Sequence, residues 1–140
     1  MAKRGIPLDR ILRVRTLQLG LVRATEARAH EKLTSEAALK ERIAQLAANV
    51  AAVETVDQAV SFLAAAHYRE RLTASALAAE GRLQTAQAEL ARATAATIEA
   101  RRDQNAIEKL MARDDAVQAL KEVRALEKAP PVRRVRHDPC

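Results

Sequence analysis

No proline interrupts the chain between Pro7 and Pro130. Because proline removes a backbone hydrogen-bond donor and clashes with the preceding turn, so long a stretch without it leaves room for very long helices. Apolar residues, mostly alanine, make up 49% of the sequence, but aromatic residues make up only 1%. A chain with so few large side chains is poorly supplied for a globular core, and this composition is typical of long helices.

The second half of the chain has the clearest periodicity, a stripe of mostly apolar residues that advances in steps of three and four. The stripe consists of Phe62, Ala65, Arg69, Leu72, Ala76, Ala79, Leu83, Ala86, Leu90, Ala93, Thr97, Ala100, Gln104, Ile107 and Met111. Such spacing predicts a coiled-coil seam. Alternation of Leu with Ala lets a partner helix approach closely, which favours a tight helical pair.

The first half is also helical in pattern, from the first turn at Pro7 onward. Its later part has Leu39, Ile43, Leu46, Val50 and Val53 in alternating steps of four and three. Its earlier part has Leu19, Val22, Ala29 and Leu33, whose stripe does not continue into Leu39. This mismatch predicts a local change of winding near residues 34–36.

A capping box separates the two halves: Thr55 would cap the third amide of a helix, and Gln58 would reach back to the amide of Thr55. We therefore expect an all-α fold in which two long helices form an antiparallel coiled-coil hairpin. The expected bounds are 8–53 for helix one, 54–58 for the turn and 59–129 for helix two, followed by a disordered basic tail at 130–140. One unbroken helix is the alternative, since no glycine or proline marks the turn.

These lengths predict an asymmetric hairpin with a C-terminal helical overhang. A turn centred near residue 56 would place Leu8 opposite about residue 104, so that about 25 residues of helix two, or about 35–40 Å, would project beyond helix one. The apolar residues of this stretch are Ile107, Leu110, Met111, Val117, Leu120, Val123 and Leu126. An apolar helical surface without a partner in its own chain predicts a binding site for another protein.

The sequence offers no arrangement of residues that suggests catalysis, a cofactor or a metal. His30, His67 and His137 are scattered, and the single cysteine, Cys140, has no second thiol to pair with. We expect a non-enzymatic protein of a reducing compartment, the cytoplasm, because no apolar run resembles a signal peptide or a membrane span.

The net charge of +6 is compatible with nucleic acid, an anionic surface or acidic protein partners. Acidic residues alternate with basic ones along both halves, as in Glu36 with Lys40 and Glu99 with Arg102, which we expect to pair within one helix. No aromatic stacking platform accompanies the basic residues, so nucleic acid is not the expected partner. The two aromatic residues are better indicators: Phe62 is expected to pack inside the hairpin, whereas Tyr68 lies one place off the seam and is a candidate contact.

Two segments resemble a known family. Residues 8–15, LDRILRVR, look like the start of the flagellar export protein FliJ and its relatives in type III secretion, and residues 106–113, AIEKLMAR, resemble a segment late in that family's second helix. The chain length and the basic ends agree with the family, and the resemblance covers residues 8 to about 126.

The resemblance implies a cytoplasmic stalk, associated only peripherally with the membrane, whose paired terminal helices enter the hexameric export ATPase. Its implied ATPase contacts here are Ile107, Leu110, Met111, Val117 and Leu120. The hairpin end would contact the cytoplasmic domain of the export gate, and other export chaperones are further partners of the family.

For the gate contact, the family pattern of an aromatic followed four residues later by an aliphatic falls on Tyr68 and Leu72. The aromatic residues that relatives can carry late in the first helix are replaced by Leu46 and Val50, which leaves that half of the gate contact without its usual residues.

Three other functions remain open at this point. The chain could be the stalk of an injectisome, with the same architecture and the same ring partner. A basic hairpin that binds nucleic acid would instead gather Lys and Arg on one face. A self-associating coiled coil would pair its overhangs with each other.

Overall fold

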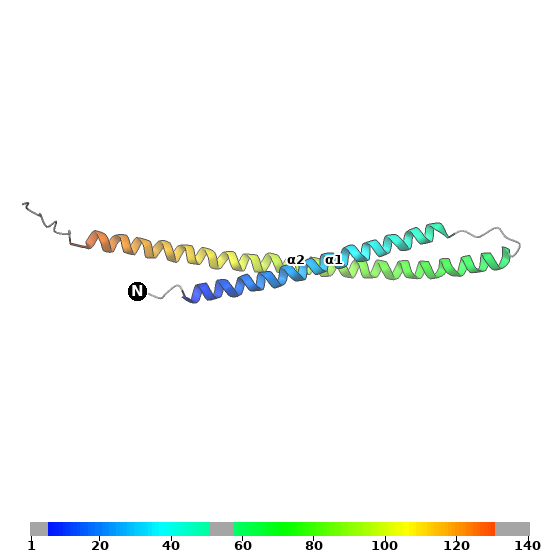
Figure 1. The fold of residues 1–140 in the computed structure, drawn as a ribbon, viewed down its shortest axis with the longest axis horizontal. Helices are drawn as coiled ribbons and strands as arrows, with labels where there is room; N and C mark the ends of the chain where they lie inside the picture. Colours follow the sequence, from blue (N-terminus) through cyan, green and yellow to red (C-terminus); the bar gives the residue numbers. More distant parts are fainter. Residues whose placement is uncertain (1–5, 51–57, 131–140) are drawn as a thin grey trace, which may run out of the picture.

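The structure, a computed structural model, describes residues 6–50 and 58–130 as two long helices, α1 (Ile6–Asn49) and α2 (Gln58–Lys128). Figure 1 shows that they run side by side in opposite directions and form one narrow rod. The described residues contain no strand. The predicted all-α antiparallel hairpin is therefore confirmed, and the alternative of one unbroken helix is wrong.

The ends of the helices follow from local chemistry. Pro7 occupies the first turn of α1, where its missing N–H costs nothing, and Asp9 complements the positive end of the helix dipole. At the other end of the chain, α2 stops at Lys128, two residues before Pro130, and the Ala129 amide donates to the Leu126 carbonyl at 3.1 Å.

The end of α1 differs from the prediction, because the helix stops at Asn49 and Val50 is already non-helical. The Arg69 guanidinium on α2 donates to the Val50 carbonyl at 2.8 Å and so satisfies an acceptor that has lost its place in the helix. The predicted capping box at 55–58 lies outside the described residues except for Gln58, where α2 begins. The predicted basic tail also falls outside them, apart from Pro130.

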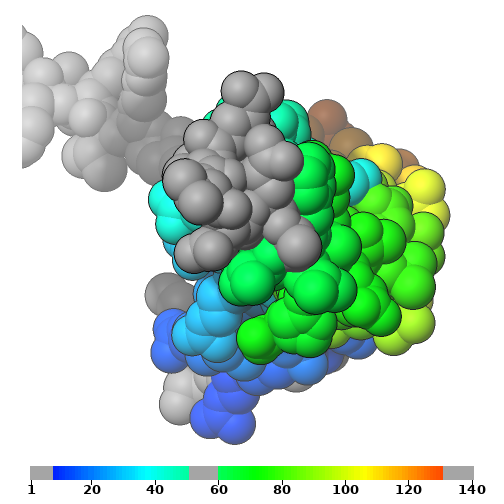
Figure 2. Space-filling view, turned by 90° about the vertical axis from the view of Figure 1, so that its right-hand side faces the viewer, coloured from blue at the N-terminus to red at the C-terminus, as the bar shows by residue number. Residues whose placement is uncertain are grey.

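The seam of α2 is confirmed over most of its length. Ala79 and Ala86 are 0% exposed, and Leu72 and Ala93 are buried. Ile43 of α1 packs with Leu72 and Ala79 in one buried cluster. Small side chains at these points let the two backbones come close together. Figure 2 looks along the rod and shows that its cross-section is narrow. Little space is therefore left for a core.

On α1 one stripe runs the whole length of the helix, so the predicted change of winding near residues 34–36 is wrong. The stripe is buried or partly buried and consists of Leu8, Leu12, Arg15, Leu19, Val22, Glu26, Ala29, Leu33, Glu36, Ile43 and Val50. Because polar residues interrupt the apolar residues of this stripe, the sequence pattern alone indicated a change of winding. Leu39 and Leu46, which we placed on the seam, are exposed beside it.

Those polar stripe residues form bonds across the hairpin. Arg15 pairs with Asp103 at 2.9 Å, and Glu36 accepts from Arg82 at 3.0 Å. The Thr94 hydroxyl donates to the Glu26 carboxylate at 3.1 Å. Each polar residue of the stripe therefore faces a partner of fitting chemistry on α2.

Two further ion pairs cross the hairpin, Lys32 with Glu89 at 2.7 Å and Lys40 with Glu80. Lys40 lowers the pKa of the Glu80 carboxyl through its hydrogen bond and its charge. Glu36 and Lys40, which we expected to pair with each other, each pair with α2 instead. Because exposed pairs contribute only ~0–1 kcal/mol each, they select the alignment of the helices more than they stabilise the rod.

The cross-helix pairs define the register, since the two residue numbers of each pair add to about 120. Leu8 therefore lies opposite about residue 112, and not 104 as predicted. The C-terminal overhang accordingly starts near residue 115 and contains about 14 residues, or ~21 Å, in place of about 25. The same register leaves the first turns of α2, up to about residue 70, beyond the end of α1.

We predict that Ala79→Leu destabilises the hairpin by about 1–3 kcal/mol, because a fully buried seam position has no room for three more carbons. Ala78→Leu is the matched control, since the neighbouring Ala78 is exposed. Chemical denaturation followed by circular dichroism measures both. Equal stability of the two variants would show that the helices do not approach closely at Ala79.

Candidate partner-binding surfaces

The described residues hold no group of three or more His, Cys, Asp or Glu side chains arranged to bind a metal ion. None of the described helices is long and apolar enough to cross a membrane. The described part of the rod has a groove between the helices, exposed apolar side chains at its two ends, and charged residues along its length.

One groove between α1 and α2 has a volume of about 490 Å³. It is lined by the seam residues Ala29 and Ala93 and by the exposed Arg28 and Arg92. Lys32, which also lines it, is already paired with Glu89 at 2.7 Å. The groove exists because small seam residues leave space that larger side chains would fill, and its free charges are positive.

Tyr68 and Leu72, the predicted gate contacts, have different environments. Tyr68 is 47% exposed, whereas Leu72 is 8% exposed and lies in the buried cluster with Ile43. Of the two, only Tyr68 presents a substantial surface to a partner. Any effect of Leu72 on binding must pass through the packing of the hairpin.

Phe62 is 60% exposed, so the expectation that it packs inside the hairpin is wrong. The reason is the register, which ends α1 opposite about residue 70 and leaves Phe62 beyond it. Val60 and Leu63 are exposed at the same end. Together with Tyr68 they make the beginning of α2, green at the right-hand end of the rod in Figure 1, an apolar tip.

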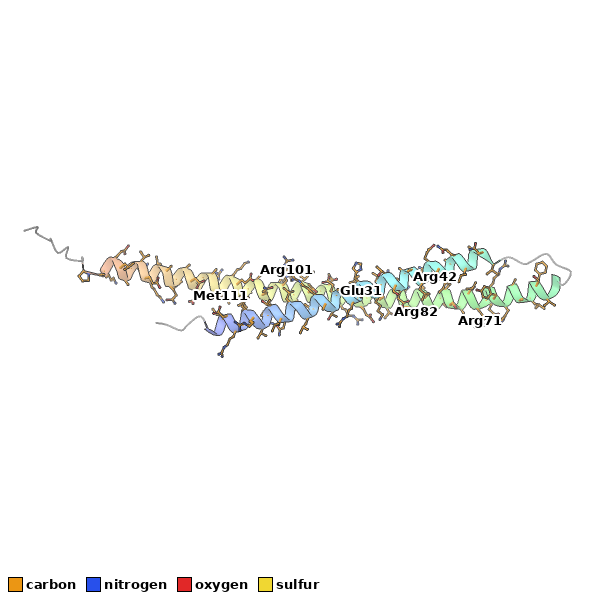
Figure 3. All side chains as sticks on the ribbon, viewed as in Figure 1. Glu31, Arg42, Arg71, Arg82, Arg101 and Met111 are labelled. Atoms are coloured by element: carbon orange, nitrogen blue, oxygen red, sulfur yellow. The ribbon has the colours of Figure 1, made fainter. Side chains whose placement is uncertain are left out.

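The five predicted ATPase contacts divide into two groups. Ile107 and Met111 are partly buried in the seam, opposite the first turns of α1, so the prediction that they lack an intrachain partner is wrong. Figure 3 places Met111 at the level where α1 begins. Leu110, Val117 and Leu120 are exposed, and the last two belong to the overhang.

The pattern of apolar residues along α2 changes at the level where α1 begins. The seam positions that follow Met111 are Asp114 and Gln118, which are polar, so the intramolecular seam stops where its partner helix stops. A second stripe with steps of four and three begins there on another face. It consists of Ala112, Ala116, Ala119, Val123 and Leu126, all of them exposed, and we call it the overhang stripe.

A comparable exposed apolar stripe lies on α1, and we did not predict it from the sequence. Val14, Leu17, Leu21 and Ala24 advance in steps of three and four and are all exposed, on a face turned away from the α1 seam. We call this set the outer stripe. Its spacing was visible in the sequence, but only the seam's burial shows that this face does not contact α2.

No family model, curated protein or solved structure matches this chain.

We predict that Leu72→Ala lowers the free energy of unfolding by about 2–5 kcal/mol, because it empties a buried seam position. Tyr68→Ala, four residues earlier and half exposed, should change it by less than about 0.5 kcal/mol. Denaturation of both variants followed by circular dichroism gives the comparison. A large loss of stability in Tyr68→Ala would mean that the ring packs within the hairpin and is not available to a partner.

Proposed function

We propose that the chain is a non-enzymatic stalk of a type III protein export apparatus, similar to the flagellar export protein FliJ. It would work in the cytoplasm, peripheral to the membrane, binding the hexameric export ATPase and linking it to the export gate. The observation that carries this proposal is the overhang, a single helix projecting beyond its partner with Leu110, Val117 and Leu120 exposed at its base and along it.

A projecting helix of this kind suits the central opening of a ring. Apolar side chains on an otherwise solvated helix are costly unless something covers them, and the inner surface of a ring can do so. The charges of the overhang are balanced, with Lys121, Arg124 and Lys128 against Asp115, Glu122 and Glu127. The contact would therefore depend on its apolar residues more than on net charge.

The mechanism would be mechanical and allosteric. A rod with one helix longer than the other has no rotational symmetry, so it touches the six subunits of a ring unequally. Unequal contacts bias which conformation each subunit adopts, and this couples nucleotide hydrolysis to the position of the rod.

The apolar tip at the opposite end of the rod would meet the export gate. Tyr68 is the exposed aromatic of the resemblance, and Phe62 adds a second exposed ring nearby in the sequence. Leu46 is exposed as well, while Val50 packs against the buried cluster. The gate surface would therefore be formed mainly by the first turns of α2.

We predict that the protein promotes assembly of the export ATPase of its own organism into a ring and raises its hydrolysis rate. Leu110→Ser combined with Leu120→Ser should abolish this stimulation without unfolding the hairpin, since both side chains are half exposed. The measurement is ATP hydrolysis against stalk concentration, with ring formation followed by light scattering. Leu77→Ser is the matched control, because Leu77 is exposed on the part of α2 that is paired with α1, far from the overhang.

Unchanged ATPase assembly and activity with saturating, folded protein would overturn the stalk proposal. Retention on a polyanion that falls steeply with salt, with no effect on the ATPase, would support the nucleic-acid alternative instead. An injectisome stalk would give the same ATPase result with a different partner enzyme, so the gene neighbourhood separates the two systems.

For the gate, we predict that Tyr68→Ala weakens binding to the export-gate cytoplasmic domain by roughly tenfold or more, the effect of losing an aromatic contact residue. Calorimetric titration of the two proteins measures it, and His67→Ala, at the exposed neighbouring position, is the control. Unaltered affinity in Tyr68→Ala would remove this residue from the gate surface.

A further inference from the structure

The face of α2 turned away from α1 carries a second stripe with steps of three and four. We call it the back stripe, and it consists of Ala74, Leu77, Gly81, Gln84, Ala88, Ala91, Ala95 and Ile98, all of them exposed. Ala74 and Gly81 each follow a buried seam residue by two positions, which is a rotation of about 200° around the helix. Such spacing over more than three heptads is typical of a helix along which another helix packs.

Nothing within the hairpin accounts for the back stripe. Leu77 is 77% exposed and Ile98 is 49% exposed. Outside its own helix backbone, no heavy atom lies within 4 Å of the point where a Cβ would stand at Gly81. A glycine inside a helix is less stable than an alanine, so the hairpin itself gains nothing from it. A bare backbone does let a second helix approach closely.

We propose that the back stripe binds the back stripe of a second copy of the chain, with the two α2 helices antiparallel. The two-fold axis of this dimer crosses α2 near residue 86, and one α1 lies on each outer side. The proposal does not rest on the stalk function, because it uses only residues of this chain and is tested without any export component.

In this alignment the numbers of two facing residues add to about 172, and large side chains face small ones. The facing pairs are Ala74 with Ile98, Leu77 with Ala95, Gly81 with Ala91 and Gln84 with Ala88. Each of the three larger side chains therefore meets an alanine, and Gly81 meets the remaining one. Facing positions that alternate in this way fill the space between two helices without voids or clashes.

The same alignment brings opposite charges together at both ends of the back stripe. In line with the stripe, Glu70 of each copy faces Arg102 of the other, and at its flank Arg71 faces Glu99. None of these four residues has a hydrogen bond or ion pair with another described residue. The two-fold axis repeats both pairs, so a register chosen for its apolar contacts also pairs these charges.

The charges disfavour a parallel dimer of the same faces. A two-fold axis along the rod would place every residue opposite its own copy, so that Glu70 would face Glu70 and Arg102 would face Arg102. In the antiparallel dimer, by contrast, no like charges face each other along the stripe. Further out, Lys109 faces Leu63.

The dimer leaves the other surfaces of the rod free. The seam with α1 lies on the opposite face of α2, and each overhang extends past Gln58, the residue at which α2 of the other copy begins. Leu110 and Leu120, which the ATPase experiment changes, lie off the back stripe. Failure of either proposal therefore leaves the other standing.

The first test is sedimentation equilibrium of the full chain over a concentration series, in which the mass should approach twice that of one chain. Gly81→Leu places four carbons between the two backbones and should raise the dimer dissociation constant by roughly tenfold or more. Leucine is a better helix former than glycine, so circular dichroism should show helicity that is retained or increased. Ser75→Leu, at an exposed position off the back stripe, is the matched control and should leave the dissociation constant unchanged.

A charge exchange tests the alignment. Arg71→Glu should raise the dissociation constant by roughly tenfold, because it sets two carboxylates opposite each other at both ends of the dimer. Adding Glu99→Arg should restore it, since the pair forms again with its charges reversed. The two positions lie about 42 Å apart along one α2, so no contact within a chain can produce this rescue.

A chain of single mass at every concentration would overturn the proposal. A Gly81→Leu dimer as tight as the parent would do the same, and so would a double charge variant that associates no better than Arg71→Glu alone.

Discussion

The close approach of the two helices through small seam residues is the constraint on which the rest of this structure depends. Ala79 and Ala86 are fully buried because nothing larger would allow the backbones to come so near. Each alanine buries little apolar area, so each turn of the hairpin contributes little stability. A rod of this kind gains stability through length, and its narrow cross-section leaves no interior in which to build an enclosed site.

Alanine seams give little information about alignment, since one alanine resembles the next. The polar residues within the seam provide it instead. Arg15 faces Asp103 and Glu36 faces Arg82, and a slip of one heptad would separate these partners and leave half-buried charges unpaired. The ion pairs therefore contribute little to the stability of the rod. Their main effect is on the register, which decides which parts of α2 lack a partner helix.

The two ends of α2 extend beyond α1, and both of them expose apolar side chains. At the tip, the register exposes Phe62 and Tyr68. On the overhang, Val117 lies on a different face from Val123 and Leu126, so the overhang offers two apolar surfaces.

The sequence by itself determined that the chain is helical and which residues of α2 face the seam from Leu72 onward, because the proline-free length and the steps of three and four depend only on local geometry. It favoured a hairpin over one unbroken helix, and the structure decided between them. It also indicated that the distal part of α2 carries apolar residues that α1 does not cover. It did not determine the register, the exposure of Phe62 or the continuous stripe on α1. In the stripe, Arg15, Glu26 and Glu36 look like solvated residues until their partners on α2 are known, because a bond between residues 46 to 88 positions apart leaves no periodic trace in either helix. Only the tertiary structure decided which apolar residues are paired within the chain and which are free to bind elsewhere.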